Sequence, residues 1–318
     1  MRNSLASEGL PALSARWFQC GRFRFDLSPS EGRVLVMGVL NLTADSFSDG
    51  GRFLGQQQAL EHALSMIEAG ADILDIGAES TRPGATAISE EEELRRVLPL
   101  IATLKGLGVA LSVDTRKPGV MLAALDAGAD MINDVEGFRC LTAHPSIPHQ
   151  GRKESSEFSP QQASLVEAIH RLKAGLCIMH MQGDPLTMQK NPIYREAVAE
   201  VCQFLQTQDN ALLSLGVATE QLVWDPGIGF GKAFEHNRAI LNRLGELQCL
   251  GRPLLIGLSR KSFLGQITGR EVGHRLAASI AGALAAVSRG ANIVRVHDVA
   301  QTVDALKVWR AIHSLSGA

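Results

Sequence analysis

Eight short runs of aliphatic residues recur along the chain with almost no polar residue inside them. They are residues 34–40, 73–76, 109–113, 131–135, 176–179, 222–224, 253–258 and 292–296. A strand exposed on one face alternates apolar and polar positions, whereas a strand of a parallel sheet is buried on both faces. The pattern therefore predicts eight strands of a parallel sheet.

Segments with helical periodicity lie between most of these runs. Residues 56–68 place apolar side chains on one stripe, and residues 89–104 begin with a serine followed by glutamates. Serine is a favoured N-cap and carboxylates stabilise the first turn of a helix, so we expect a helix that begins at Ser89. Residues 275–288 and 299–313 are expected to form the last two helices.

A weak internal repeat links these elements. Residues 68–77, 126–135 and 289–299 each end a helix at a glycine and enter a strand that carries a polar group at its end. Eight strand–helix units of roughly 35 residues would nearly fill the chain, which favours a single (β/α)8 TIM barrel of the α/β class. The alternative is an open doubly wound sheet, but no glycine fingerprint follows the first strand.

Two segments fall outside the repeating units. Residues 1–33 form an N-terminal extension, in which residues 18–27 predict a hairpin placed to cover the N-terminal mouth of the barrel; the barrel domain then spans residues 34–318. Residues 136–160 form a long polar loop after the fourth strand. Because this composition buries little surface, we expect a mobile insertion.

Composition and charge exclude some classes of partner. The chain has 31 Lys and Arg against 33 Asp and Glu, and aromatic residues make up 5%. This balance offers no bulk positive charge to nucleic acid or a membrane, and few base-stacking platforms. Five cysteines without a C-x-x-C pair argue against a disulfide framework or zinc site and predict a cytoplasmic protein. No apolar run predicts a signal peptide or a membrane span.

Polar or charged residues end all eight predicted strands. Along the chain these are Asn41, Asp75, Asp114, Asn133, Asp134, His180, Asp225, residues 259–261, Arg295 and His297. Any one of them fits a turn or a helix cap. Because the carboxyl ends of barrel strands form the active-site face, their regular recurrence favours one shared site.

Cationic residues cluster at two of these strand ends. Arg295 and His297 are two residues apart on one strand and point to the same side, and Arg82 follows the second strand. Together they predict a pocket for an anion such as phosphate. The alternative for Arg82 is an ion pair with Glu79 or Glu92.

Acceptor groups are expected deeper in the barrel. Asp114, Asn133 and Asp225 suit a heterocycle rich in N–H donors, and Ser262 is placed to cap the helix after the seventh strand. The chain has no G-x-S-x-G elbow for acyl chemistry and no H-E-x-x-H metal motif. Mg²⁺ held mainly by phosphate oxygens would need few protein ligands.

Eight ordered motifs resemble the dihydropteroate synthases of the folate pathway. They are MGVLNLTADSFSDGG (37–51), DIGAESTRPGA (75–85), SVDTRKP (112–118), GADMINDV (128–135), CIMHMQGDPLTMQ (177–189), DPGIGFGK (225–232), GLSRKSFLG (257–265) and RVHDV (295–299). The resemblance implies a (β/α)8 barrel, usually a homodimer and a sulfonamide target. Its members join 6-hydroxymethyl-7,8-dihydropterin pyrophosphate to p-aminobenzoate and release pyrophosphate, with Mg²⁺.

The resemblance also implies roles for individual residues. Pterin binding falls to Asp114, Asn133, Met179, Asp225, Phe230 and Lys261. Pyrophosphate binding falls to Asn41, Arg82, Arg295 and His297, with Asn41 also on Mg²⁺. The p-aminobenzoate site is formed by Phe47, Thr81, Arg82, Pro83 and Ser262. The catalytic set is Lys261, Asp225, Asp114 and Asp49, with Asp49 facing the cation that forms when pyrophosphate leaves.

Two other functions remain open at this point. A pterin domain of a corrinoid-dependent methyltransferase would need a weaker anion site. Four residues count against it: Arg82, Lys261, Arg295 and His297. A non-catalytic pterin-binding paralogue would bind the pterin without turnover. The chain departs from the family pattern at Ala44, where a proline is usual, and at Ala78, where a glycine is common.

Overall fold

A closed barrel of eight parallel strands forms the centre of the computed structural model, which describes residues 16–28, 33–42, 52–79, 87–142, 158–184 and 187–313. The barrel strands are β3 (Leu35–Asn41), β4 (Ile73–Gly77), β5 (Ala110–Asp114), β6 (Met131–Asp134), β7 (Gly175–Met179), β8 (Leu222–Asp225), β9 (Leu255–Gly257) and β10 (Ile293–Val296). They pair in the order β8-β7-β6-β5-β4-β3-β10-β9. A bridge from Trp224 to Leu254 joins the two edges, so all eight predicted strands and the barrel are confirmed.

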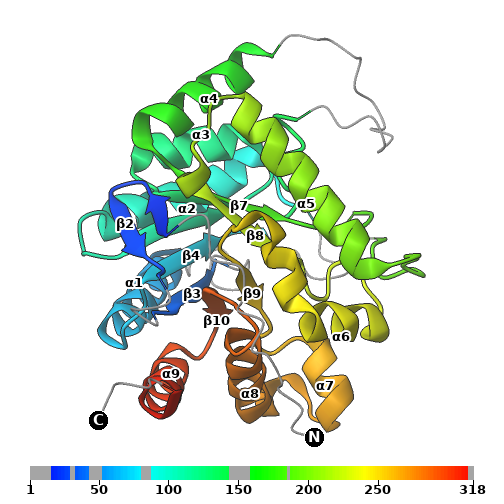
Figure 1. The fold of residues 1–318 in the computed structure, drawn as a ribbon. Helices are drawn as coiled ribbons and strands as arrows, with labels where there is room; N and C mark the ends of the chain where they lie inside the picture. The colour runs from blue at the N-terminus through cyan, green and yellow to red at the C-terminus, as the bar shows by residue number, and fades with distance from the viewer. Residues whose placement is uncertain are drawn as a thin grey trace, which may run out of the picture.

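Helices surround this barrel (Figure 1). They are α1 (Arg52–Glu68), α2 (Glu90–Leu104), α3 (Pro118–Ala127), α4 (Pro160–Leu172), α5 (Ala197–Ser214), α6 (Phe234–Asn242), α7 (Ser262–Thr268), α8 (Leu276–Val287) and α9 (Val299–His313), with 3-10 turns η2 (Thr219–Gln221), η3 (Leu244–Leu250) and η4 (Val272–His274). None of the described helices has the length and apolar content needed to cross a membrane.

The sequence predicts N-caps at Ser89 and Ser262, and the first turns of α2 and α7 show whether each is correct. The hydroxyl of Ser89 accepts the N–H of Glu92 at 3.1 Å and caps α2, as expected. The predicted cap of α7 is wrong, because Lys261 occupies the N-cap position and Ser262 is already the first helical residue. A cap must lie just outside the helix for its side chain to reach the free N–H groups of the first turn.

The internal repeat ties neighbouring strands together at the start of the barrel. In each copy a glycine with positive φ ends the preceding helix; these are Gly70, Gly128 and Gly290. Two residues later a side-chain oxygen accepts a backbone N–H from the adjacent strand or its entry, at 2.9–3.0 Å: Asp72 from Val36, Asp130 from Leu111, and Asn292 from Leu254. These polar groups therefore serve the fold, at the end of the barrel opposite the predicted site.

The N-terminal hairpin closes that end of the barrel, as predicted. Strands β1 (Trp17–Cys20) and β2 (Phe23–Asp26) pair antiparallel, and Phe18 and Phe25 point into the barrel. They pack on apolar side chains from the strands: Leu35, Met37, Ile73, Ala110, Met131, Cys177, Val223, Leu255 and Ile293. The barrel interior is therefore apolar next to the hairpin, and polar side chains begin in the next layer towards the carboxyl ends of the strands.

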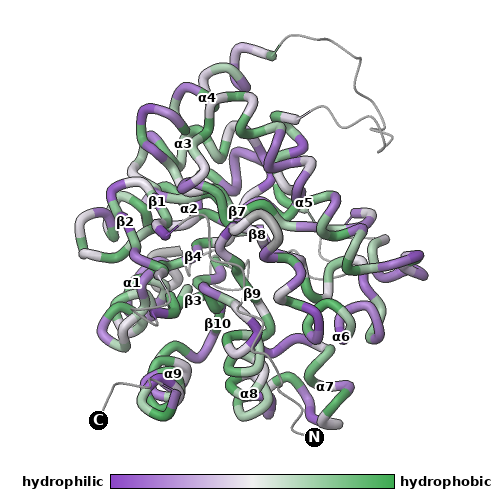
Figure 2. The backbone as a smooth tube through the Cα atoms, viewed as in Figure 1, coloured by the Kyte–Doolittle hydropathy of each residue, from purple (hydrophilic) through white to green (hydrophobic). Residues whose placement is uncertain are grey.

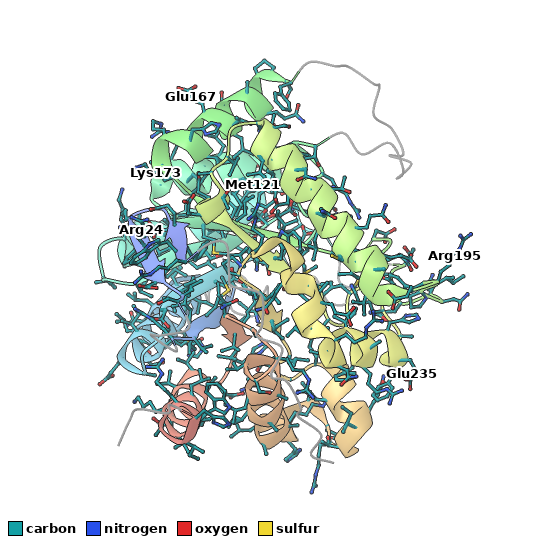
Figure 3. The ribbon with its side chains drawn as sticks, viewed as in Figure 1. Arg24, Met121, Glu167, Lys173, Arg195 and Glu235 are labelled. Atoms are coloured by element: carbon teal, nitrogen blue, oxygen red, sulfur yellow. The ribbon has the colours of Figure 1, made fainter. Side chains whose placement is uncertain are left out.

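Hydropathy separates the layers of the molecule. Figure 2 shows mainly hydrophobic strands at the centre and mixed helices around them. In Figure 3, Glu167, Arg195 and Glu235 lie at the periphery, and all three are exposed. The larger hydrophobic core fills the space between strands and helices.

The segment predicted as a mobile insertion, residues 136–160, is described only at its two ends. Phe138 and Leu141 are buried and join the hydrophobic core, so ordered packing continues to residue 142. The carboxylate of Asp134 accepts the N–H groups of Glu136 and Phe138, which fixes this turn. Residues 143–157 lie outside the described residues, and their mobility stays a prediction.

Candidate active site

Polar side chains meet inside the barrel directly above the apolar layer. Asp75, Asp114, Asn133 and Asp225 come from four different strands, and all four are buried. Arg295 of β10 reaches the same place, where its Nε donates to Asp75 at 2.6 Å. The structure thus brings together the three acceptor residues predicted from the sequence.

Arg295 bridges two carboxylates in this layer. Its Nε contacts Asp75, and its Nη2 donates to Oδ2 of Asp114 at 2.9 Å. Burial opposes the charge of Arg295, but the two carboxylates outweigh it and raise the pKa of the guanidinium. Arg295 is therefore a permanent cation held at the acceptor-rich part of the site.

Two acceptor atoms here have no hydrogen-bond partner. Oδ1 of Asp114 and Oδ1 of Asn133 are buried and unpaired among the described residues. Buried polar atoms almost always have partners, because leaving one unpaired costs about 1–3 kcal/mol. The arrangement suits a ligand that presents N–H donors.

Burial shifts the protonation of these carboxyl groups. The pKa of Asp114 is raised to about 7, mainly by burial, with Arg295 opposing and Asp75, Glu93 and Asp134 adding like charge. Burial also raises the pKa of Asp225, against the opposing ammonium of Lys261. A ligand with N–H donors would stabilise both ionised forms.

Lys261 lies close enough to Asp225, Asp114 and Arg295 for their charges to affect its pKa. Its ammonium donates to the carbonyl oxygen of Ile228 and lies 4.5 Å from the centre of the Phe230 ring. Burial lowers the pKa of Lys261 to about 8, although Asp225 favours its charge. Phe230 also packs on an apolar cluster that includes Met179. A flat ring entering here would meet one apolar wall and one cation.

The glycine-rich segment 225–232 is held in place by the buried amine of Lys232. Nζ of Lys232 lies 2.8 Å from Nδ1 of His180 and donates to the carbonyl oxygens of His180, Gly227 and Phe230 at 3.0–3.1 Å. A Cβ at Gly227 would lie 2.0 Å from the carbonyl oxygen of His180. The segment is therefore packed closely against His180, and this packing fixes the backbone that carries Asp225 and Phe230.

Two of the predicted pyrophosphate residues, Asn41 and His297, lie nearer the carboxyl ends of the strands. Asn41 is exposed at the last position of β3. The backbone N–H of His297 donates to Oγ of Ser259 at 3.2 Å, and its Nδ1 lies 3.1 Å from the same atom. Ser262 is exposed on the first turn of α7. The described contacts of Arg295 are with the carboxylates rather than with these groups.

Several predicted residues lie outside the described residues: Ala44, Phe47, Asp49, Thr81, Arg82 and Pro83. The two carboxylates named as alternative partners for Arg82 form ion pairs with described residues. Glu79 binds Arg116 and Lys117, and Glu92 binds two arginines of α2.

Sequence reasoning gave no site role to Asp75 or Lys232. Asp75 stands at a predicted strand end, and its pairing across the sheet with Ser112 of β5 places it inside the barrel. Lys232 is the last residue of the DPGIGFGK motif, but nothing in the motif indicates that its side chain turns inward. Both roles depend on neighbours that are distant along the chain.

Comparison with known proteins agrees with this geometry. The model of the family described as "Pterin binding enzyme" matches residues 37–297. The dihydropteroate synthase of Haemophilus influenzae is 44% identical over 87% of this chain and 93% of its own length, and that of Escherichia coli K12 is 43% identical over 87% and 90%.

Solved structures agree as well. Xanthomonas albilineans dihydropteroate synthase with 4-aminobenzoic acid superposes with a TM-score of 0.79 at 43% identity, covering 95% of this chain and all of that one. The Burkholderia cenocepacia enzyme complexed with 7,8-dihydropteroate gives 0.78 at 45% identity, covering 94% and 97%. The chain therefore belongs to the pterin-binding enzymes, in the family of dihydropteroate synthases.

Proposed function

We propose that this chain condenses 6-hydroxymethyl-7,8-dihydropterin pyrophosphate with p-aminobenzoate to give 7,8-dihydropteroate and pyrophosphate. The observation that carries the proposal is the pair of buried, unpaired acceptors on Asp114 and Asn133, close to a third buried acceptor residue, Asp225. A pterin offers a guanidine-like edge of N–H donors, which such acceptors bind well. The matching relatives are synthases, which favours this function over a corrinoid-linked domain or a non-catalytic paralogue.

The pterin ring would lie between the carboxylates and Lys261. Met179 and Phe230 supply apolar contact to its face, and the Lys261 ammonium donates to a ring acceptor. These roles place the ring deep in the barrel and leave its exocyclic methylene directed towards the open end.

The pyrophosphate would bind at that open end. Arg295 and His297 of the last strand and its exit, with Asn41 and Arg82, supply the neutralising groups. The amide oxygen of Asn41 is a hard ligand that suits Mg²⁺. No group of three or more His, Cys, Asp or Glu in the described part of the chain could hold a metal. A Mg²⁺ bound to Asn41 and phosphate oxygens would neutralise charge on the leaving group.

The reaction would proceed by cleavage before attack. The C–O bond breaks and its electron pair leaves with pyrophosphate, which gives a methylene cation delocalised into the pterin ring. The carboxylates of Asp114 and Asp225 stabilise that positive charge in a buried, low-dielectric site. The amine nitrogen of p-aminobenzoate then forms the C–N bond and loses its proton to water, so no strong general base is required.

The second substrate would bind among residues at the mouth. Phe47, Thr81, Pro83 and Ser262 keep the p-aminobenzoate roles implied by the resemblance, and Asp49 faces the cation. Closure of this site would exclude water, which otherwise captures the cation.

Assembly and location are further parts of the proposal. A homodimer formed through α8 and α9 would cover Leu276, Val308 and Ile312, which are exposed in the monomer. Light scattering that returns only monomer at all concentrations would refute the dimer. Cys20 and Cys177 are free thiols, which fits a reducing cytoplasm.

The test of the proposed pterin site is calorimetric titration with the pterin pyrophosphate. Asp225→Ala should lose at least tenfold in affinity, since a buried acceptor of the ring edge is removed. Asp126→Ala is the matched control, because this carboxylate forms an exposed ion pair with Arg171 away from the barrel interior. Equal affinity of wild type and Asp225→Ala would refute the proposed site.

A further inference from the structure

Asp75 is a buried carboxylate that the proposed mechanism does not use. It lies on β4 and is fully buried. Its Oδ1 accepts the hydroxyl of Ser112 at 2.7 Å, and its Oδ2 accepts both Nδ2 of Asn133 at 3.1 Å and Nε of Arg295 at 2.6 Å. Both oxygens are therefore occupied by protein donors, so Asp75 acts on its neighbours rather than on a ligand.

The first neighbour is the amide of Asn133. An asparagine side chain has a donor end and an acceptor end, and either end can face a given partner. A carboxylate offers acceptors only, so Asp75 can bind only the Nδ2 end. The Oδ1 end is thereby turned away from Asp75, and this atom is one of the two buried acceptors without a partner.

The second neighbour is Arg295. Its planar guanidinium spans Asp75 and Asp114, with Nε on the first and Nη2 on Oδ2 of the second. This fixes the Asp114 carboxylate with Oδ2 bound and Oδ1 unpaired. One buried carboxylate therefore controls both unpaired acceptors, one directly and the other through Arg295.

We propose that Asp75 is a positioning residue that sets the acceptor-only pattern of the pterin site by orienting the Asn133 amide and anchoring Arg295. This inference rests on the proposed pterin-binding role of Asp114 and Asn133. It assigns to Asp75 the selection of ligands that present N–H donors, and it requires the carboxylate rather than the volume of the side chain.

The substitution Asp75→Asn tests the inference, since it keeps the shape and introduces an amide donor. The Asn133 amide can then turn, and Arg295 loses one of its two carboxylates. We expect the KM for the pterin pyrophosphate to rise roughly tenfold or more, the scale of one lost hydrogen bond to a charged group. The KM for p-aminobenzoate should change less than about twofold, because that substrate does not meet these acceptors.

Asp209→Asn is the matched control. Asp209 of α5 is also fully buried, and its carboxylate accepts Nε of Arg252 at 2.8 Å and Nε1 of Trp224 at 2.9 Å, in the layer between barrel and helices. The Asp209→Asn substitution should lower thermal stability and leave both KM values unchanged. If Asp75→Asn raised both KM values alike, or Asp209→Asn raised the pterin KM as much, Asp75 would have only a structural role.

A second experiment exchanges Asp75 and Asn133, and it keeps the inference testable if the single variant Asp75→Asn does not fold. Asn133→Asp sets two carboxylates against each other and should lose pterin binding. Adding Asp75→Asn restores a donor facing the carboxylate at position 133 and again leaves an oxygen for the ligand. Nε of Arg295 still lacks its acceptor, so the double variant should bind the pterin at least tenfold more tightly than Asn133→Asp alone but less tightly than the wild type. No recovery would overturn the inference. A wild-type chain that binds no pterin pyrophosphate would refute the proposed function and this inference together, whereas wild-type binding left unmoved by Asp75→Asn would refute the inference alone.

Discussion

Asp114→Asn should make the unliganded protein less sensitive to alkaline pH while it destroys the pterin site. The pKa of Asp114 is raised to about 7 in the folded chain, chiefly by burial, from an ordinary value near 3.8. The native state therefore holds this proton more tightly than the unfolded chain does. Stability from this group is greatest at low pH and is lost as pH rises through that interval.

The size of the effect follows from the shift. Between pH 5 and about pH 7 the carboxyl group of Asp114 keeps its proton in the folded chain but has lost it in the unfolded chain. Over these roughly two pH units, at roughly 1.4 kcal/mol per unit, the wild type loses at most about 3 kcal/mol of its free energy of unfolding. Asn cannot ionise, so the variant escapes this loss. Asp75 remains to balance the charge of Arg295, which limits any new cost of the substitution.

Urea unfolding of both proteins at pH 5 and pH 8, without ligand, measures this difference. Asp134 also has a pKa raised to about 7, mainly by burial, but it is present in both proteins and cancels in the comparison. The variant should gain about 2–3 kcal/mol on the wild type between the two pH values, and calorimetry should show weaker pterin binding. The same pH dependence in both proteins would refute the reasoning.

Three further predictions concern the N-terminal hairpin, Lys261 and the glycine-rich segment 225–232. Phe18→Ala should lower the free energy of unfolding by about 3–5 kcal/mol, because a fully buried ring is removed from the N-terminal end of the barrel. A decrease below about 1 kcal/mol in chemical unfolding would contradict the closing role of the hairpin. The pKa of Lys261, lowered to about 8 by burial, predicts that kcat/KM falls above that pH; this alkaline limb should be absent in Lys261→Met. Gly227→Ala should raise the pterin KM at least tenfold in steady-state assays, since its Cβ would lie 2.0 Å from the carbonyl oxygen of His180 at a φ of +66°; an unchanged KM would show that the loop does not position the ring.

Local patterns predicted most of the fold. Uninterrupted aliphatic runs identified the barrel strands, because strands buried on both faces carry no alternation. The hairpin at residues 18–27 and the Ser89 cap depend on near neighbours and were confirmed. The Ser262 cap was wrong by one position, since helix boundaries are the least constrained feature of a sequence pattern.

The site was predictable only in part. Asp114, Asn133 and Asp225 are brought together because parallel strands end on one face of a barrel. The roles of Asp75 and Lys232 were not predictable from the pattern, since each depends on the direction in which a side chain turns and on partners far away in the chain. The ordering of Phe138, inside the segment expected to be mobile, likewise comes from tertiary packing against the core.

The most direct test of the central claim is an assay of the purified chain with the pterin pyrophosphate, p-aminobenzoate and Mg²⁺ that follows both products together. We predict equal yields of pyrophosphate and 7,8-dihydropteroate, and loss of both in Arg295→Ala, whose guanidinium holds the acceptor layer and faces the leaving group in the proposed site. Tight pterin binding without release of either product would contradict the account and leave the chain as a binding protein.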